Sequence, residues 1–233
     1  MEISILNWRI SVERVFWSER RLQDSYDEAA ARWQDAIQRT GTIEAYDWLW
    51  DALRRDGVLD SIPHDGTILD AGLGTGALSH ALMPALPSVA WHGIDLSAGM
   101  LEEAGARSPY PMVLEQASIT DLPYSDDTFD CVMTAHVVEH LETPLAGIRE
   151  LLRVLKAGQP FVLIATRRCL WTQALSLRWN FSPLAEADVC RWLYESGADN
   201  VNVRKLLSAD TAQPHFLSDN AHISLVYTGV KRA

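Results

Sequence analysis

Two acidic residues and three glycines near the middle of the chain carry the strongest chemical signal. Residues 67–76 read Thr-Ile-Leu-Asp-Ala-Gly-Leu-Gly-Thr-Gly, and the apolar run Val89 to Ile94 ends in Asp95 after one helix-length segment. A buried strand that runs into a glycine-rich turn lets a ligand approach the backbone, and an acid that closes the next strand can accept both hydroxyls of a ribose. The spacing therefore predicts a site for a nucleoside cofactor.

Asp70, two residues before the first glycine, indicates which nucleoside cofactor fits. Gly72, Gly74 and Gly76, followed by Ala77, also satisfy the loose dinucleotide pattern, which is weak when taken alone. A carboxylate at position 70 would repel a pyrophosphate, but it would suit a cofactor that carries an ammonium group. The charge favours S-adenosylmethionine over NAD. The alternative is that the glycines only permit a tight strand-to-helix turn.

Short apolar runs from residue 67 onward predict five parallel strands. The runs are Thr67 to Ala71, Val89 to Ile94, Met112 to Ala117, Phe129 to Ala135 and Phe161 to Thr166. Two later runs, Val201 to Leu207 and His222 to Val230, have no helix between them. They predict an antiparallel pair at an edge of the sheet.

Helices are predicted between these runs and over the first 60 residues. Thr143-Pro144 predicts the start of a helix that reaches about Leu155, and Ser182-Pro183 predicts another that Gly197 ends. In the amino-terminal part, the apolar residues at helical spacing are Tyr26, Ala29, Ala30, Trp33, Ile37, Tyr46, Leu49, Trp50 and Leu53. We therefore expect an N-terminal helical extension over residues 1–60 and one compact α/β unit over residues 61–233.

The composition fits a soluble, enzyme-sized domain that acts on a small molecule. With 233 residues, 48% of them hydrophobic, the chain can bury a substantial core. A net charge of -11 argues against attachment to nucleic acid or to an anionic membrane, and the pattern contains neither a signal peptide nor a bilayer-spanning stretch. Cys131, Cys169 and Cys190 lack metal-ligand spacing, which fits reduced thiols. We expect a cytoplasmic monomer or homodimer.

Groupings of residues along the chain form a longer pattern. They are Ile68 to Gly76, Gly93 to Ser97 with Met100-Leu101, Asp121 to Tyr124, Thr128 to Asp130, His136 to Leu141 and Arg153 to Gly158. In this order they resemble the motifs of the class I S-adenosylmethionine-dependent methyltransferases of small-molecule type. The resemblance implies a Rossmann-like, seven-stranded, mostly parallel sheet with one reversed strand, helices on both faces and an N-terminal helical lid.

One position departs from that family. An acidic residue for the adenine amino group is common at the position that Ser118 fills here. The resemblance therefore implies that this contact is made by a hydroxyl, a backbone group or water.

The predicted cofactor site draws on the carboxyl ends of the first four predicted parallel strands. Its predicted contacts are Tyr26, Asp70, Ala71, Gly72, Gly74, Asp95, Leu96, Met100, Ser118, Ile119, Ala135 and His136. The backbone amides of Ala71 and Gly72 are expected to face the methionine part of the cofactor. Leu96, Met100 and Ile119 are expected to sandwich adenine, with plain core packing as the alternative.

His136 and Tyr26 are the predicted catalytic residues. A sulfonium already makes its methyl group electrophilic, so the enzyme needs mainly to align a nucleophile and exclude water. His136 is a candidate general base, with a structural role as the alternative. Tyr26 shares a helix face with Trp33, and this helix either covers the cofactor or only packs on the domain. His136, Glu139 and His140 lack an independent further ligand, so we expect no metal.

These features predict an S-adenosylmethionine-dependent methyltransferase that acts on a small-molecule acceptor. Aromatic residues that favour an aromatic or lipophilic acceptor are Trp171, Trp179, Phe181, His215 and Phe216. One alternative is an enzyme of the same fold that cyclises or cleaves the cofactor and releases methylthioadenosine. A non-catalytic partner-binding module would not explain the carboxylates of Asp70 and Asp95. A dehydrogenase would bind a dinucleotide, and the charge of Asp70 would repel its pyrophosphate.

Overall fold

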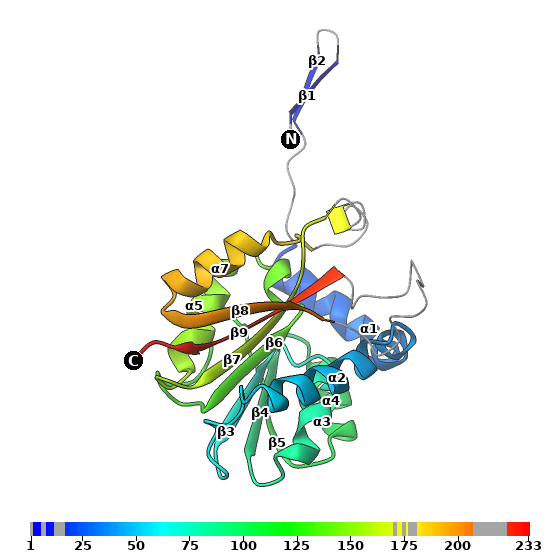
Figure 1. Cartoon of the computed structure of the whole chain (residues 1–233). Helices are drawn as coiled ribbons and strands as arrows, with labels where there is room; N and C mark the ends of the chain where they lie inside the picture. The colour runs from blue at the N-terminus through cyan, green and yellow to red at the C-terminus, as the bar shows by residue number, and fades with distance from the viewer. Residues whose placement is uncertain are drawn as a thin grey trace.

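A computed structural model describes residues 2–5, 8–11, 17–169, 172–173, 176, 181–206 and 223–233. Its main feature is a seven-stranded sheet with helices on both faces (Figure 1). Four of the aromatic residues assigned to the acceptor, Trp171, Trp179, His215 and Phe216, lie outside the described residues.

The sheet has the order β5-β4-β3-β6-β7-β9-β8, and within it only β9 runs against its neighbours. The strands are β3 (Thr67–Ala71), β4 (Ala90–Asp95), β5 (Met112–Gln116), β6 (Cys131–Ala135), β7 (Pro160–Thr166), β8 (Ala198–Lys205) and β9 (Ser224–Lys231). The five predicted parallel strands and the antiparallel tail pair are confirmed, with small differences at their ends. The reversed strand β9 lies between β7 and β8, so β8 forms the edge.

The strand order brings the loops of the predicted site together. From β3 the chain moves outward through β4 to β5, and it then returns to place β6 on the other side of β3. All four strands are parallel, so the loops that follow them meet at one edge of the sheet. A crevice at such a reversal of strand order is where open α/β sheets bind ligands.

Helices cover both faces of the sheet, with α2, α3 and α4 on one side and α5 and α7 on the other (Figure 1). Their bounds are α1 (Glu19–Arg39), α2 (Thr42–Arg55), α3 (Ala77–Leu82), α4 (Ala98–Arg107), α5 (Pro144–Val154) and α7 (Glu186–Glu195), with short 3-10 helices η1 (Met83–Ala85) and η2 (Val138–His140). The predicted start at Thr143-Pro144 is confirmed. Among the described residues, no helix is both long and apolar enough to cross a bilayer.

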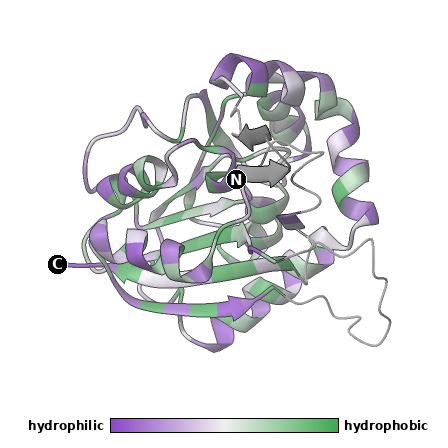
Figure 2. Ribbon diagram, turned by 90° about the horizontal axis from the view of Figure 1, so that it is seen from above, coloured by the Kyte–Doolittle hydropathy of each residue, from purple (hydrophilic) through white to green (hydrophobic). Residues whose placement is uncertain are grey.

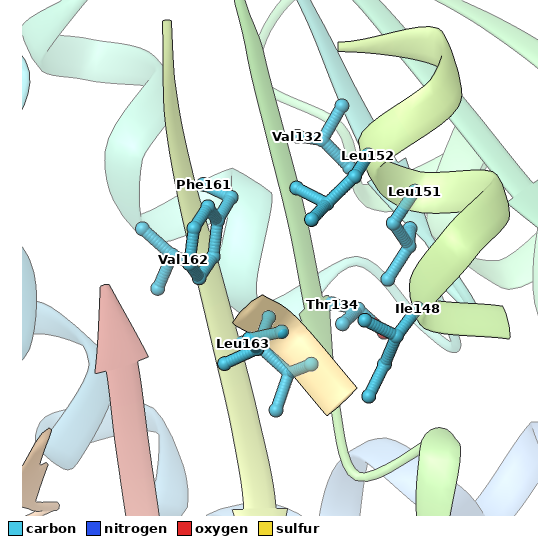
Figure 3. A pocket seen from close by; sticks show the side chains of 9 residues that line it. Val132, Thr134, Ile148, Leu151, Leu152, Phe161, Val162 and Leu163 are labelled. Atoms are coloured by element: carbon cyan, nitrogen blue, oxygen red, sulfur yellow. The ribbon is translucent and has the colours of Figure 1, made fainter. Parts of the chain in front are cut away.

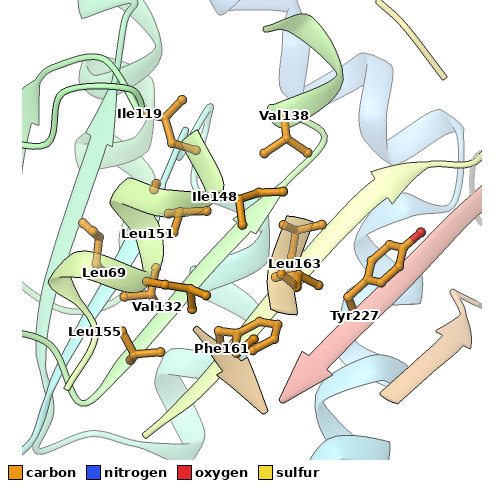
Figure 4. Packing of buried hydrophobic residues seen from close by; sticks show 14 of the residues in the cluster. Leu69, Ile119, Val132, Val138, Ile148, Leu151, Leu155, Phe161, Leu163 and Tyr227 are labelled. Carbon is orange, nitrogen blue, oxygen red and sulfur yellow. The ribbon is translucent and has the colours of Figure 1, made fainter. Parts of the chain in front are cut away.

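Alternate residues of the central strands feed two buried cores. Leu69 and Val132 pack with Leu151 of α5 on one face (Figure 4), whereas Ile68 packs with Leu49 of α2 on the other. Each such side chain contributes about 1.5 to 3 kcal/mol when fully buried. Hydropathic colouring shows apolar residues along the sheet and polar residues on the outer helix surfaces (Figure 2). Helix α2 therefore shares the core of the sheet.

Two predicted helical regions differ from the structure. Strands β1 (Glu2–Ile5) and β2 (Trp8–Ser11) pair antiparallel, where a helix was predicted. Their apolar and polar residues alternate with period two, which is a strand pattern. Helix α7 begins at Glu186 rather than at Ser182-Pro183, because Leu184 pairs its backbone with the end of β7 in an extended bridge.

Candidate functional site

The turn between β3 and α3 requires its glycines for conformation and for space. Gly72, Gly74 and Gly76 have φ angles of 75°, 55° and 84°, which L side chains rarely adopt. A Cβ at Gly72 would clash with Val137, whereas a Cβ at Gly74 would meet nothing within 4 Å. Gly74 therefore borders open space, as a ligand that approaches the backbone would need.

Protein acceptors already engage two amides of this turn. The amide of Gly72 donates to the carbonyl of Ile94 at 2.8 Å, and the amide of Gly74 donates to Asp95 Oδ2 at 2.8 Å. The expectation that the Gly72 amide faces the cofactor is revised accordingly, because that donor is used within the fold. Ala71 is fully buried, at 0% exposure, so it shapes the turn from beneath.

Asp95 ends β4 and is held in a fixed orientation at the open side of the turn. Its Oδ2 accepts from Gly74, and its Oδ1 accepts from the amide of Ser97 at 2.9 Å. Burial raises the pKa of Asp95, the bonds from Ser97 and Gly74 oppose that rise, and the charge of Asp27 adds to it. Each carboxylate oxygen accepts one backbone N–H and can accept a further donor. This geometry fits the two hydroxyls of a ribose.

Asp70 is a buried carboxylate directly beneath the glycine turn. Its residue is 1% exposed, and Oδ2 has no hydrogen-bond partner among the described residues. Burial raises the pKa of Asp70 to about 7, contacts with Ser79 lower it and the charge of Asp95 raises it further. A buried carboxylate with one oxygen left without a hydrogen bond is costly, so a cation at this position would be bound favourably.

The predicted adenine contacts follow the two neighbouring strands β4 and β5. Asp95 and Gln116 are paired in register, so Leu96 and Ser118 lie on adjacent loops at the same edge. Met100 is 1% exposed and Ile119 is 4% exposed, and both therefore contribute chiefly to packing around this edge. Leu96 and Ser118 are partly exposed, as a residue that contacts a ligand must be.

The carboxyl end of β6 holds a polar cluster around His136. His136 follows Ala135 with a φ of 59°, a strained conformation for a non-glycine residue. Glu139 Oε1 accepts from the amide and hydroxyl of Thr166, at 3.1 and 2.8 Å, and lies 3.2 Å from His136 Nδ1. His136 Nε2 lies 3.4 Å from the hydroxyl of Ser224.

Glu139 remains ionised in this cluster even though it is buried. Burial alone would raise the pKa of Glu139, but the hydrogen bond from His136 and the charges of His136 and His140 outweigh that effect and hold it at about 2. The described residues contain no group of three or more side chains suited to a metal ion. The arrangement is an anion that orients an imidazole, which is a common support for a general base.

Helix α1 spans the site and is tied to each of its loops by a side chain. Gln34 accepts from Thr75 of the glycine turn at 2.7 Å, and Asp27 accepts from Ser97 at 2.5 Å and from the amide of Gly99 at 3.0 Å. The two further ties are Glu19 with Ser118 at 2.6 Å and Tyr26 with His140 at 3.2 Å. Four loops that follow four strands are thus bridged by one helix.

Aromatic rings extend from α1 toward the segment before α7. Tyr26 meets Trp33 and His140 edge to face, with ring centroids 5.5 and 5.9 Å apart, and His140 lies 6.4 Å from Phe181. Burial raises the pKa of Tyr26, and the charges of Asp95 and Glu139 raise it further. Tyr26 therefore keeps its proton at neutral pH and offers a ring and a hydroxyl, not a base.

An internal cavity between α5, β6 and β7 is a packing void and not the site. Its volume is about 10 Å³. Figure 3 shows side chains that line it. The lining residues are Val132, Thr134, Ile148, Leu151, Leu152, Phe161, Val162, Leu163 and Leu193. A space of this size barely admits one water molecule.

Several residues at the site were not found from the sequence. Glu19, Asp27 and Gln34 contact loops 99, 70 and 41 residues away, and Thr166 bonds a carboxylate 27 residues away. Spacing along the chain carries no signal for such contacts, because they depend on how α1 crosses the sheet edge.

The chain has the fold and the site of a Rossmann-like domain for a nucleoside cofactor. The sheet has one reversed strand, a glycine turn follows β3, and the acid Asp95 ends the next strand. The family described as a methyltransferase domain matches residues 69–163. Residues 69–163 thus match a methyltransferase domain, and the chain is similar to S-adenosylmethionine-dependent methyltransferases.

Individual relatives support this assignment. The ubiquinone/menaquinone biosynthesis C-methyltransferase UbiE of Geobacter sulfurreducens is 31% identical over 163 residues, which cover 67% of this chain and 62% of that enzyme. A demethylmenaquinone methyltransferase of Clavibacter sepedonicus is 36% identical over 143 residues, which cover 59% of this chain and 55% of that enzyme. The chain thus spans 62% and 55% of the lengths of these two relatives.

A solved structure supports the fold. Magnesium protoporphyrin IX methyltransferase of Synechocystis PCC 6803, with bound S-adenosylhomocysteine, aligns with a TM-score of 0.70 and 19% identity. The alignment covers 93% of this chain and 100% of that chain. At this identity, the likeness concerns the architecture of the domain.

Proposed function

We propose that this protein binds S-adenosylmethionine and transfers its methyl group to a small-molecule acceptor. The observation that carries the proposal is the buried carboxylate of Asp70, whose Oδ2 has no hydrogen-bond partner among the described residues, beneath a glycine turn that also faces Asp95. Two acids around one turn suit a cofactor with an ammonium group and a ribose, and they disfavour a pyrophosphate. A cytoplasmic location and a monomeric or homodimeric state remain predictions.

The proposed cofactor contacts keep Asp70, Asp95 and Leu96 from the residues named from the sequence. Asp95 would hold the ribose, Asp70 would face the methionine ammonium, and Leu96 would border adenine. When bound, S-adenosylmethionine supplies a methyl group made electrophilic by the sulfonium. The protein then has to align the acceptor and exclude water from the reacting atoms.

Helix α1 is the proposed lid over this cofactor. Its four side-chain ties to the surrounding loops support a closed position across the sheet edge. A lid that closes in this way excludes water and completes the site. Tyr26 would present its ring to the sulfonium side of the pocket, because an aromatic face attracts a cation.

The acceptor is proposed to be a phenol or a hydroquinone. The chain of rings from Trp33 through Tyr26 and His140 to Phe181 offers an aromatic surface beside the site. The names of two relatives connect them with quinones. A phenolic acceptor loses a proton as its oxygen or ring carbon attacks the methyl group, and His136 is the proposed base for that proton.

A nucleoside analysis tests the proposal. The enzyme is incubated with S-adenosylmethionine alone and with S-adenosylmethionine plus a reduced demethylmenaquinone, and the products are identified by mass spectrometry. We expect S-adenosylhomocysteine and a methylated ring only when the acceptor is present. Rapid, enzyme-dependent formation of methylthioadenosine without an acceptor would overturn methyl transfer and make the cofactor itself the substrate.

Binding of S-adenosylhomocysteine is expected to depend on pH through Asp70. The pKa of Asp70 is raised to about 7, so the free protein keeps much of this carboxyl protonated near neutrality. An ammonium beside Asp70 favours the ionised form, so binding releases a proton and weakens as the pH falls through about 7. We expect binding about tenfold weaker at about pH 6 than at about pH 8, measured by calorimetry.

Asp70→Asn separates this effect from the titration of Asp95, whose pKa is also raised. The variant is expected to bind more weakly at every pH and to lose most of the proton release. Because the folded pKa of Asp70 lies above the usual 3.8, the free protein loses stability as the pH rises from about 3.8 to about 7, and the ligand offsets that cost. If the parent protein binds S-adenosylhomocysteine equally well between about pH 6 and about pH 8, the ammonium group of the ligand does not lie beside Asp70.

A further inference from the structure

Helix α1 brings a carboxylate to the loop after β5. Glu19 is the first residue of the helix, and its Oε1 accepts from the hydroxyl of Ser118 at 2.6 Å and lies 3.5 Å from the hydroxyl of Thr120. Among the described residues, Glu19 has no salt-bridge partner. Glu19 is exposed, and its second carboxylate oxygen has no hydrogen-bond partner of its own in that part of the chain.

The position of this carboxylate follows from the sheet. Ser118 comes two residues after Gln116, which pairs in register with Asp95 of the neighbouring strand. A nucleoside with its ribose on Asp95 extends its base along the same edge, toward the loop after β5. Glu19 therefore lies beside the loop that faces the outer edge of the base.

Adenine presents a 6-amino group on that edge, which can only donate hydrogen bonds. Ser118 does not complement this group well, because its hydroxyl proton is committed to Glu19 and its oxygen is shared with the amide of Thr120 at 3.2 Å. A carboxylate accepts through two oxygens and has no proton to repel the amine. Glu19 is the better partner on chemical grounds.

We infer that Glu19 accepts a hydrogen bond from the adenine 6-amino group, so that the lid helix, and not the sheet loop, recognises the base. The inference rests on the proposed function. It replaces the hydroxyl, backbone or water contact expected at Ser118 with a carboxylate supplied from α1. Closure of α1 and recognition of adenine then become one event.

If Glu19 had only a structural role, its loss would affect nucleoside binding in a different way. An acid in the first turn stabilises its helix through the backbone dipole, and the tie to Ser118 fixes the start of α1. Loss of either effect would weaken binding of every nucleoside to a similar degree. Base recognition, by contrast, depends on the group at position 6 of the purine.

The experiment compares two ligands that differ at position 6 of the purine and in the proton on the neighbouring N1. Dissociation constants are measured by calorimetry for S-adenosylhomocysteine and S-inosylhomocysteine, in which an oxygen replaces the 6-amino group. The parent protein is expected to prefer the adenine form by about tenfold or more, the size of one charge-assisted hydrogen bond. Glu19→Gln is expected to reduce that preference to less than about twofold, because an amide can pair with either group.

Two further variants complete the test. Glu28→Gln, at an exposed acid on the same helix, is expected to keep the parent preference. Adding Ser118→Asp to Glu19→Gln returns a carboxylate to the loop and is expected to restore the preference for adenine. If Glu19→Gln keeps the parent preference, the inference is overturned, even if both affinities fall. If the parent binds neither ligand, the proposed function fails, and this inference fails with it.

Discussion

Asp95→Ala is expected to weaken the binding of S-adenosylhomocysteine by about 1.5 to 3 kcal/mol, roughly 10- to 150-fold. The substitution removes the proposed acceptor for the ribose hydroxyls. It also removes the acceptor of the Gly74 and Ser97 amides, which would then need other partners. Calorimetry on the parent and the variant measures the difference directly.

Matched variants separate the ribose contact from a general effect of charge. Glu102→Ala removes an exposed acid from α4, close in the chain to the same loop, and is expected to change the affinity less than twofold. Asp95→Asn keeps the size of the side chain but loses its charge, and we expect an intermediate loss. If Asp95→Ala binds as tightly as the parent, the cofactor does not lie on β4.

The sequence predicted the parts of the site that depend on local pattern. The glycine turn and Asp95 were inferred from two apolar runs and the residues that end them, and the structure joins them by a hydrogen bond of 2.8 Å. A buried strand and its closing residue are neighbours in sequence and in space. The alternation of strand and helix then places adjacent strand ends together, because parallel crossovers have a fixed hand.

The sequence could not predict contacts that depend on the placement of a whole helix. Periodicity identified α1, and it correctly put Tyr26 and Trp33 on one face. It gave no information on which loop each polar residue would meet, so Glu19 and Asp27 were not considered as parts of the site. The contacts of both residues span at least 70 residues of chain and involve exposed acids, which are usually solvated.

The helix prediction was wrong in the region before residue 19, which contains strands β1 and β2. The alternation in Glu2–Ile5 and Trp8–Ser11 has period two, and it was outweighed by the helical spacing that begins near Tyr26. At Ser182-Pro183 the opposite occurred. A good helix-start signal was overridden by backbone pairing of Leu184 with the end of β7, which is a tertiary effect.

His136→Ala is expected to lower kcat with a phenolic acceptor by about 100-fold or more, the usual contribution of a general base. Glu139 is proposed as its positioning residue, since its Oε1 lies 3.2 Å from His136 Nδ1 and is anchored by Thr166. Glu139→Gln is therefore expected to lower kcat by about tenfold or more while the dissociation constant of S-adenosylhomocysteine changes less than about twofold. Steady-state kinetics and calorimetry together separate these effects.

The pH dependence distinguishes positioning from simple loss of structure. The pKa of Glu139 is held at about 2, below its usual 4.5, so its carboxylate stabilises the fold above about pH 4.5 and loses that effect as the pH falls toward about 2. Throughout a neutral assay Glu139 is therefore an anion that orients the His136 ring, and Glu139→Gln is expected to lower kcat across the whole neutral part of the pH profile. Glu142→Gln, at an exposed acid three residues further along, should leave the profile unchanged. If His136→Ala and the parent have the same kcat and the same pH profile of kcat, the cluster around His136 has only a structural role. The acceptor would then lose its proton directly to water.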